Sequence, residues 1–405
     1  MTEKLYYSDS HIMNFSAEAE LCFPFHGKYA VVLNRTAFFP EGGGQSADTG
    51  LIGESRVEDV QEIAVGKLPD GLQEKLQAFR PDEKLIVHIC SQPVAEGTEY
   101  RCALDAEQRL RRMQNHSGEH IVSGLVHQKF GYDNVGFHMS AGFMTIDFSG
   151  ELTKDQLDEI ETEANKAIRS DIEIIQLFPS PDELKNIEYR SKLDLTENVR
   201  LVEIPGIDRC ACCAPHVKRT GEIGIIKILT SERHRGGVRV TLTCGLDALD
   251  DYRMRQQSVA EISETLSAKR DEVSSAVSRL AAEKDALKVK LAEAENQLVG
   301  LKAAAVEPRE GNICLFENLE SEVSRRELVN LLVGKCGGAA AVFCGSDETG
   351  YTYVIGSRTV DLRKNSRAIN DAIGGRGGGR PEMIMGNATK SGEEIRAYFN
   401  DIVFL

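Results

Sequence analysis

The chain has 405 residues, a length that predicts two to four domains at roughly 100–200 residues each. Hydrophobic residues make up 41% and charged residues 27%, an ordinary globular composition that excludes a wholly disordered or fibrous protein. Acidic residues number 63 and basic residues 48, so the net charge is −15 and any binding of nucleic acid must use local basic patches.

The sequence predicts neither a signal peptide nor a membrane span. The N-terminal stretch MTEKLYYSDS lacks a basic segment followed by an apolar one, and no uninterrupted apolar run of about 18 residues occurs. Ten cysteines are too few for a disulfide scaffold in a chain of this length, so we expect a cytoplasmic protein with reduced thiols. A cysteine cluster in that compartment indicates metal binding or catalysis.

The fold class that we expect is α+β, beginning with a β-rich half. Residues 1–100 contain β-branched and aromatic runs, such as YAVVLNRTAFFP and KLIVHIC, and predict a β-barrel-like domain that includes a glycine-rich loop. Residues 101–245 predict an α/β sandwich core with amphipathic helices over 105–129 and 153–170. Its strands are expected over 137–148, 201–204, 223–229 and 238–243.

The second half predicts a long helical segment and a last α/β domain. Residues 246–305 carry apolar side chains at seven-residue spacing, which is typical of a coiled coil or, if the helix breaks near Ser267, of a hairpin capped by that serine. Residues 306–405 predict strands, a helix over 359–374, a glycine-rich loop and a closing helix near 392–400. The seven-residue line consists of Val259, Leu266, Val273, Leu280, Leu287, Ala294 and Leu301.

Two separate pairs of side chains have the spacing of metal ligands. His116 and His120 are four residues apart on a predicted helix and therefore share one face. Cys212 and His216, in the string CACCAPHV, are also four residues apart. Three imidazoles and one thiolate suit zinc, either as a closed structural site or, with one donor absent, as a site that activates water.

The metal pattern leaves two alternatives open. Cys210 and Cys213 compete with Cys212 as sulfur donors, so spacing does not identify the ligand. Residues 116–120 also read H-x-x-E-H, in which Glu119 would be the general base of a zinc peptidase. Because Glu119 is turned about 100° from His120 around the helix, we expect it to be a solvated helix residue.

Two glycine-rich strings are candidates for ligand contact. Gly42, Gly43, Gly44 and Gln45 form either a loop that touches a polar ligand or a tight barrel turn. Residues 374–381 place Arg376 and Arg380 among glycines, which suits contact with phosphate in an otherwise acidic chain. Basic clusters elsewhere include Arg363, Lys364 and Arg367.

Taken together, RTAFFPEGGGQ, NHSGEH, CACCAPHV and GGRGGGRPEM, in this order, resemble the alanyl-tRNA editing proteins of the AlaX type, long form. This family combines the editing domain and the C-terminal domain of alanyl-tRNA synthetase without the aminoacylation domain. The resemblance implies hydrolysis of mischarged tRNA(Ala), chiefly seryl-tRNA(Ala) and in some members glycyl-tRNA(Ala).

The resemblance also implies roles for individual residues. One zinc ion per chain would be held by His116, His120, Cys212 and His216, although the family more often has Cys-Gly-Gly-Thr-His at the second pair. Gly42, Gly43, Gly44 and Gln45 would contact the substrate, and Thr36 would recognise the serine hydroxyl. The C-terminal domain, with Arg376, Arg380 and Lys364, would bind tRNA. A hairpin near Ser267 and a homodimer through the helical segment or the C-terminal domain follow the same pattern.

Two other functions remain as alternatives to the editing hydrolase. A closed four-ligand set and the apolar helical line also fit a non-enzymatic tRNA-binding or dimerisation protein with structural zinc. The H-x-x-E-H string fits a zinc peptidase less well, because it leaves CACCAPHV and the glycine-rich segments unexplained. Since no aminoacylation domain or ATP site is visible in the sequence, we do not expect aminoacylation.

Overall fold

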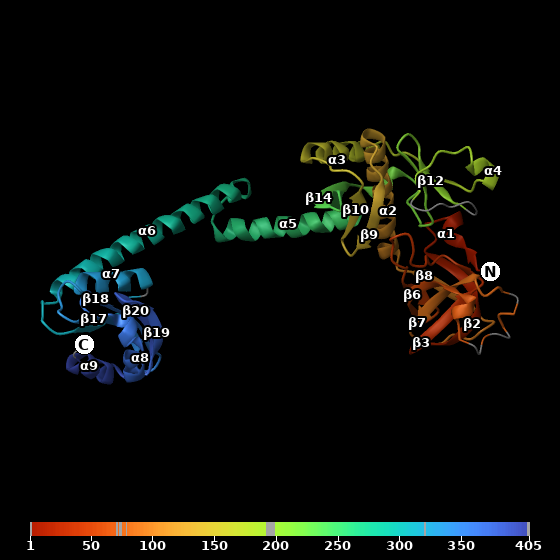
Figure 1. Cartoon of the computed structure of the whole chain (residues 1–405). Coiled ribbons are helices and arrows are strands. Elements are labelled where there is room, and N and C mark those ends of the chain that lie inside the picture. Colours follow the sequence, from red (N-terminus) through yellow and green to blue (C-terminus); the bar gives the residue numbers. More distant parts are fainter. Residues whose placement is uncertain are drawn as a thin grey trace. The chain divides into compact units, whose positions relative to one another are not determined.

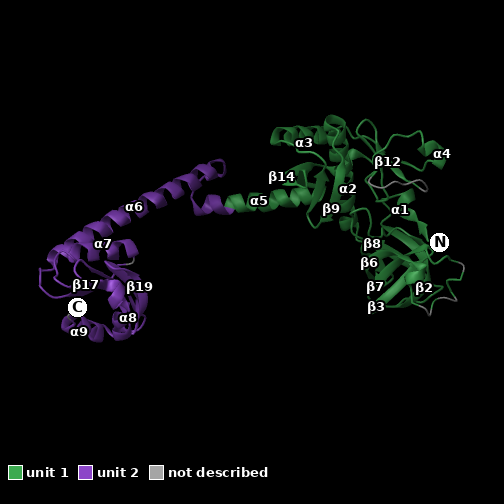
Figure 2. Cartoon of the chain, viewed as in Figure 1, with its two compact units in different colours: residues 1–260 green, residues 261–405 purple. Residues whose placement is uncertain are grey.

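The computed structural model describes residues 2–402, apart from 70, 71, 73, 74, 78, 192–198 and 320. The chain divides into two compact units, residues 1–260 and 261–405 (Figures 1 and 2). Both contain helices and strands, which confirms the α+β class. The four-way domain division remains a prediction. Within the described ranges, no helix is both long and apolar enough to cross a membrane.

The first unit begins with a closed barrel whose strands follow the order β2-β3-β7-β6-β5-β8. On β2, Ala17 and Ala19 belong to one core cluster, whereas Leu21 and Phe23, which follow a register shift, belong to a second cluster. Strand β4 lies outside this order and pairs in parallel with β1. The elements are β1 (Glu3–Lys4), α1 (Leu5–Ser8), β2 (Asn14–Phe25), β3 (Lys28–Leu33), β4 (Arg35–Thr36), β5 (Gly50–Ile52), β6 (Ser55–Ala64), β7 (Lys84–Cys90) and β8 (Glu99–Leu104).

An α/β layer follows in the same unit, with a four-stranded sheet in the order β14-β15-β10-β9 and a three-stranded sheet in the order β11-β12-β13. The single strand predicted over 137–148 is wrong, because it is a hairpin that turns at Gly142, which has a φ of 83°. The strands are β9 (Asn134–Ser140), β10 (Phe143–Phe148), β11 (Ile175–Leu177), β12 (Leu201–Ile204), β13 (Asp208–Ala211), β14 (Ile226–His234) and β15 (Gly237–Cys244).

Helix α2 (Ala106–Phe130) is the central helix of this layer. It begins as predicted at Asp105, whose carboxylate accepts a hydrogen bond from the backbone N–H of Gln108, and it ends at Gly131 in the left-handed conformation. Its residues from 113 to 126 are all buried. Gly118 and Gly124 allow this, since a Cβ there would meet Cys244 Sγ at 2.4 Å and the Ile207 carbonyl oxygen at 2.4 Å.

The remaining helices of the layer are shorter or lie at its edge. Helix α3 (Lys154–Arg169) has the amphipathic pattern predicted for it and starts with a capping box at Thr153. Helix α4 spans Pro181–Leu184, and a single 3-10 turn spans Thr220–Ile223.

The predicted long helical segment is interrupted near the predicted residue. Helix α5 (Gly245–Thr265) and helix α6 (Val273–Ala305) are separated by a short connection in which Ser267 has a φ of 48°. Ser267 does not cap the second helix, because the N-cap of α6 is Glu272. Along α6 six apolar side chains are largely exposed, by between 42% and 70%, and three of them belong to the seven-residue line. The six are Val277, Leu280, Leu287, Leu291, Leu298 and Leu301.

The second unit ends in a five-stranded sheet in the order β16-β17-β18-β20-β19, with one core cluster on each face. Helices α8 and α9 cover one face, and α6 and α7 cover the other. The elements are β16 (Ile313–Phe316), α7 (Glu322–Leu332), β17 (Ala339–Ser346), β18 (Gly350–Ser357), α8 (Leu362–Ile373), β19 (Arg376–Arg380), β20 (Met383–Ala388) and α9 (Gly392–Asp401).

Strand β19 corrects the sequence analysis, which predicts a loop for the string RGGGR. It is an exposed edge strand that pairs antiparallel with β20. A side chain does not fit at Gly377, because a Cβ there would meet the Met385 carbonyl oxygen at 2.2 Å and the Tyr353 hydroxyl at 2.3 Å.

Candidate metal centre

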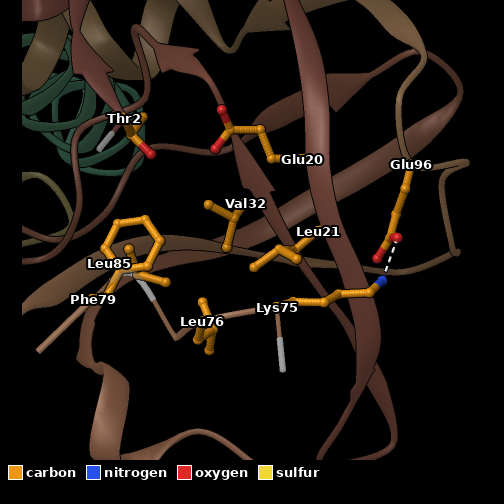
Figure 3. Close-up of a pocket in the computed structure, with 9 residues that line it drawn as sticks. All are labelled: Thr2, Glu20, Leu21, Val32, Lys75, Leu76, Phe79, Leu85 and Glu96. Atoms are coloured by element: carbon orange, nitrogen blue, oxygen red, sulfur yellow. Dashed lines mark hydrogen bonds and ion pairs between the residues drawn. The ribbon is translucent and has the colours of Figure 1, made fainter. Parts of the chain in front are cut away.

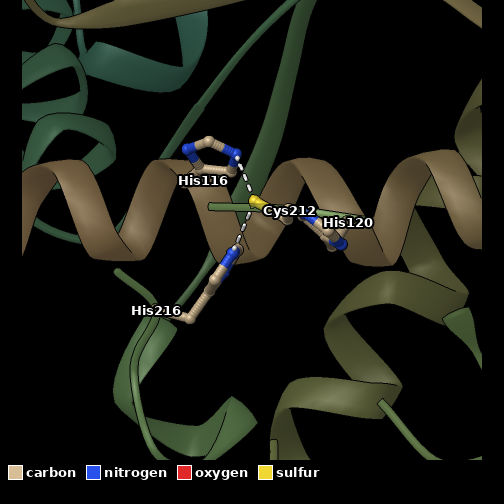
Figure 4. A group of neighbouring side chains, drawn as sticks. All are labelled: His116, His120, Cys212 and His216. Atoms are coloured by element: carbon tan, nitrogen blue, oxygen red, sulfur yellow. Dashed lines mark hydrogen bonds between the residues drawn. The ribbon is translucent and has the colours of Figure 1, made fainter. Parts of the chain in front are cut away.

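Four potential metal ligands from two distant segments meet in the first unit. His116 and His120 come from α2, and Cys212 and His216 come from the loop after β13 (Figure 4). One ligand atom from each side chain lies within 4.8 Å of the others. The Cys212 sulfur is 3.5 Å from Nε2 of His116 and 3.3 Å from Nε2 of His216.

The three imidazoles of this group are oriented by hydrogen bonds on their outer nitrogens. Nδ1 of His116 donates to Oε1 of Gln45 at 2.9 Å, and Nδ1 of His120 donates to the carboxylate of Asp208 at 2.9 Å. Nδ1 of His216 lies 3.1 Å from the hydroxyl of Ser117. In the first two cases the acceptor binds the proton on Nδ1, so Nε2 is the nitrogen that faces the other ligands. This outer set of partners is typical of metal-binding histidines.

The surroundings of Cys212 and His216 favour the protonation states that bind a metal. Burial opposes ionisation of Cys212, but the imidazoles of His116 and His216 outweigh it and hold the pKa of the thiol well below its usual range. Burial lowers the pKa of His216 to about 3, so this ring is neutral. A thiolate and neutral imidazoles are the forms that coordinate a divalent ion.

His120 differs because its partner is itself part of an ion pair. Burial lowers its pKa, but the hydrogen bond to the Asp208 carboxylate outweighs burial and raises the pKa well above its usual value. Asp208 also accepts two hydrogen bonds from Arg190, at 2.7 and 2.9 Å, which fix the carboxylate against the imidazole. Neither Asp208 nor Arg190 is predicted from sequence, because an acid 88 positions from its histidine leaves no local pattern.

The three neighbouring cysteines have different surroundings. Cys212 is the thiol within the group of three histidines. Cys210 approaches His120 and Asp208 instead, in a second and overlapping cluster. Cys213 is exposed as a whole residue. Protein atoms around its sulfur nevertheless raise the pKa of this thiol to about 11.

The glycine-rich string of the barrel is a tight turn that reaches the metal candidates. Gly42 and Gln45 exchange two backbone hydrogen bonds of 3.0 Å, and Gly43 and Gly44 between them have φ values of 60° and 83°. This is the geometry of a type I′ turn. The side chain of Gln45 is 1% exposed, and its Nε2 has no hydrogen-bond partner among the described residues. The turn therefore presents a buried, unused donor beside His116.

Glu119 is not the solvated helix residue that we expect from sequence. It is 5% exposed, because α2 is buried over this stretch. Its carboxylate accepts hydrogen bonds from the Ser123 hydroxyl and the Asn134 amide, and lies 3.7 Å from Nε2 of His120. Glu119 thus belongs to the polar surroundings of the histidines.

Thr36 lies in β4 and is completely buried. Its hydroxyl accepts a hydrogen bond from the backbone N–H of Phe38 and lies 2.8 Å from Nε2 of His88. Both contacts are with the barrel, and the predicted role of Thr36 in recognising a serine hydroxyl remains a proposal.

Arg200 is a second buried cation that the sequence analysis misses. It is 5% exposed, and its Nη1 donates to the backbone carbonyls of Cys212 and Ala214, each at 2.8 Å. Its Nη2 has no hydrogen-bond partner within the described part of the chain. Arg200 therefore holds the loop that carries Cys212 and His216, and keeps one N–H unused.

The basic residues expected to bind tRNA lie in the second unit. Arg376 and Arg380 are both exposed and, being four apart on β19, project from the same face of that strand. Gly378 lies between them, and a Cβ there would meet nothing within 4 Å. Lys364 is an exposed residue of α8.

A separate cavity of about 330 Å³ lies at the barrel (Figure 3). Its walls are mostly apolar, and the ion pair between Lys75 and Glu96 lies at its side. None of the predicted site residues lines it. The lining residues are Thr2, Glu20, Leu21, Val32, Lys75, Leu76, Phe79, Leu85 and Glu96.

Comparison with known proteins finds matches to part and to most of the chain. Residues 199–240, which include Cys212 and His216, match the family described as the threonyl and alanyl tRNA synthetase second additional domain. The chain is also 30% identical to the alanyl-tRNA editing protein AlaX-L of Pyrococcus horikoshii over 252 residues, which cover 62% of the chain.

Alanine–tRNA ligases match a larger share of the chain. The chain is 27% identical to the ligase of Ignicoccus hospitalis over 394 residues and 29% identical to that of Methanopyrus kandleri over 418 residues. These matches cover 94% and 95% of the chain. The chain spans 59% of the length of the editing protein and 40% and 42% of the two ligases. The comparisons confirm the resemblance to the long AlaX-type editing proteins.

Proposed function

We propose that the chain is a hydrolase that deacylates mischarged tRNA(Ala) in trans, chiefly seryl-tRNA(Ala) and also glycyl-tRNA(Ala). The observation that carries the proposal is the meeting of His116, His120, Cys212 and His216 with the unused donor of Gln45. The resemblance to AlaX-L, named as an alanyl-tRNA editing protein, supplies the substrate class.

In this proposal the four side chains bind one zinc ion. The donor set of three imidazoles and one thiolate suits zinc, and the outer hydrogen bonds on Nδ1 are those a ligand histidine needs. When bound, zinc would supply a positive charge that holds or polarises the groups around the ester.

The chain's own residues would orient the ester and stabilise the charge that develops on it. Nε2 of Gln45 is a buried donor that can hold the ester carbonyl oxygen as it becomes an oxyanion. The rigid type I′ turn fixes this donor relative to His116. Thr36 remains our candidate for recognising the serine hydroxyl, which an alanine site cannot strongly reject.

The second unit would bind the body of the tRNA. Arg376 and Arg380 on β19, with Lys364 on α8, would contact phosphates, and this local positive charge would offset the acidic chain. The apolar side chains of α6 support a homodimer, because six of them are exposed by 42–70% in the single chain.

The test is release of amino acid from Ser-, Gly- and Ala-tRNA(Ala) by the purified chain, with and without a zinc chelator. We expect release of serine and glycine, sparing of alanine, and loss of activity with the chelator. His116→Ala should abolish release, whereas His127→Ala, at a histidine side chain 44% exposed on the same helix, should not. Release of alanine at the same rate would refute the proposal.

Zinc content and casein hydrolysis, measured beside deacylation, separate the two alternatives. Zinc binding with no hydrolysis of any ester would favour a tRNA-binding protein with structural zinc. Hydrolysis of casein that Glu119→Gln abolishes, with zinc retained, would favour the peptidase.

A further inference from the structure

Two aromatic side chains and one arginine from distant segments meet beside the loop that carries Cys212. Tyr7 lies on α1, Phe178 follows β11, and Arg200 precedes β12. The ring centroids of Tyr7 and Phe178 are 6.0 Å apart, and the Arg200 guanidinium carbon lies 5.1 Å from the Tyr7 centroid. None of these three residues is a candidate metal ligand or part of the glycine turn.

Hydrogen bonds hold the Arg200 guanidinium in place and leave its Nη2 without an acceptor in the described part of the chain. Its Nε donates to Gln176 at 3.2 Å, and its Nη1 donates to two carbonyls of the metal-binding loop. Nη2 is buried and has no hydrogen-bond partner among the described residues. A buried guanidinium N–H without an acceptor costs stability, and an oxygen of a bound ligand would satisfy it.

Phe178 gives this group an open apolar face. Its side chain is 59% exposed, although a phenylalanine at the end of a strand would normally be covered. Lys4 also lies over the Tyr7 ring, at 5.5 Å, but its charge is paired with Glu62. Among the described residues, the positive charge next to the rings that has no ion-pair partner is therefore that of Arg200. Aromatic faces beside a guanidinium are how proteins stack unpaired bases of RNA.

The position of the group agrees with the chemistry proposed for the metal centre. In an aminoacyl-tRNA the ester joins the amino acid to the terminal ribose, so the last base lies one sugar away from the reacting carbon. Arg200 binds the carbonyl of Cys212, the residue whose thiol lies among the three histidines. A nucleoside whose ribose is at the metal centre would thus have its base near the aromatic group.

We infer that Phe178 stacks on the 3′-terminal base of an RNA strand, that Tyr7, whose ring plane is tilted 58° from that of Phe178, contacts the edge of the same base, and that Arg200 Nη2 donates to an oxygen of the same nucleotide. This inference rests on the proposed function, since it names the part of that substrate that these residues bind. It predicts tolerance toward the identity of the base, because every base offers a face for stacking.

The first test uses fluorescence and needs no turnover. The chain contains no tryptophan, so Phe178→Trp introduces a single reporter. Titration with 5′-AMP should quench this reporter in a saturable way, and ribose 5-phosphate, which lacks the base, should not. Tyr252→Trp is the matched control, because Tyr252 is 62% exposed on α5 and lies outside the group. Absence of quenching, or equal quenching at both positions, would overturn the inference.

The second test measures deacylation of Ser-tRNA(Ala). Phe178→Ala should raise KM about tenfold or more, since stacking of one base on one ring is worth roughly that factor. Phe178→Tyr should restore binding, and Tyr252→Ala should leave KM unchanged. Zinc content, measured alongside, confirms that the metal-binding loop is intact in each variant.

The outcomes separate this inference from the proposed function. Quenching by 5′-AMP without hydrolysis of any aminoacyl-tRNA would keep the base-binding site and reject the editing activity. Serine release with an unchanged KM for Phe178→Ala and no quenching would keep the activity and reject the site.

Discussion

Gln45 in the barrel turn accepts a hydrogen bond of 2.9 Å from Nδ1 of His116, although the two residues are 71 positions apart. The bond connects the β-barrel to the central helix of the α/β layer. It leaves Nε2 of His116 facing the Cys212 sulfur and Nε2 of Gln45 without a partner among the described residues. One glutamine can thus orient a metal ligand and present a donor to the substrate.

Two substitutions of Gln45 separate these roles. Gln45→Ala removes the acceptor from His116 and should weaken zinc binding about 10–100-fold, as loss of an outer partner does elsewhere. Gln45→Glu keeps an acceptor but removes the Nε2 donor, so it should retain zinc and lose about 10²–10³ in turnover. Zinc affinity is measured by competition with a chelator, and turnover by single-turnover deacylation. A Gln45→Ala variant that holds zinc as tightly as the unaltered chain would contradict the assignment.

The cysteine cluster gives a prediction with two built-in controls. Cys212→Ser should abolish zinc binding near neutral pH, because the low-pKa thiolate lies among the three histidines. Cys213→Ser should keep the metal, since Cys213 is exposed and outside the group, and so should Cys210→Ser. Elemental analysis of the purified variants gives zinc per chain. Loss of zinc in either control variant would reassign the sulfur ligand.

The buried histidine of the barrel makes stability depend on pH. Burial lowers the pKa of His88 from 6.5 to about 4, so the folded barrel keeps this ring neutral while the unfolded chain protonates it below pH 6.5. Unfolding therefore takes up a proton between pH 6.5 and pH 4. As the pH drops through this range, the contribution of His88 to the free energy of unfolding falls by up to about 3 kcal/mol.

Urea unfolding of the full chain between pH 7 and pH 5 measures this effect. His88→Gln should flatten the pH dependence, although it also costs stability at neutral pH because it disturbs the contact with Thr36. An identical pH slope in the variant would show that His88 does not contribute.

The arginines of β19 predict how tRNA binding depends on salt concentration. If Arg376 and Arg380 contact phosphates, Arg376→Ala and Arg380→Ala should each weaken tRNA binding at low salt. Each should also lower the slope of log affinity against log salt by about one. Arg279→Ala, at an exposed position of α6, is the matched control and should leave the slope unchanged. Equal slopes for all three variants would argue against phosphate contact at β19.

Local sequence patterns predicted the helices better than the strands. Helices α2 and α3 follow from apolar spacing, and in the structure Asp105 and Thr153 cap their first turns. The hairpin within 137–148 was not predicted, because its turn has one glycine in a continuous strand-like run. Strand β19 was not predicted, because glycine disfavours strands unless a neighbour such as Tyr353 leaves no room for a Cβ.

The sequence by itself determined that His116 and His120 share one helical face and that a second donor pair lies far along the chain, because both spacings are local. Only the tertiary structure decided that Cys212, rather than its neighbours, lies among all three histidines, and that Gln45 and Asp208 orient two of them. These contacts join residues more than 70 positions apart. They depend on how the barrel and two sheets pack around α2, and no local periodicity encodes that packing.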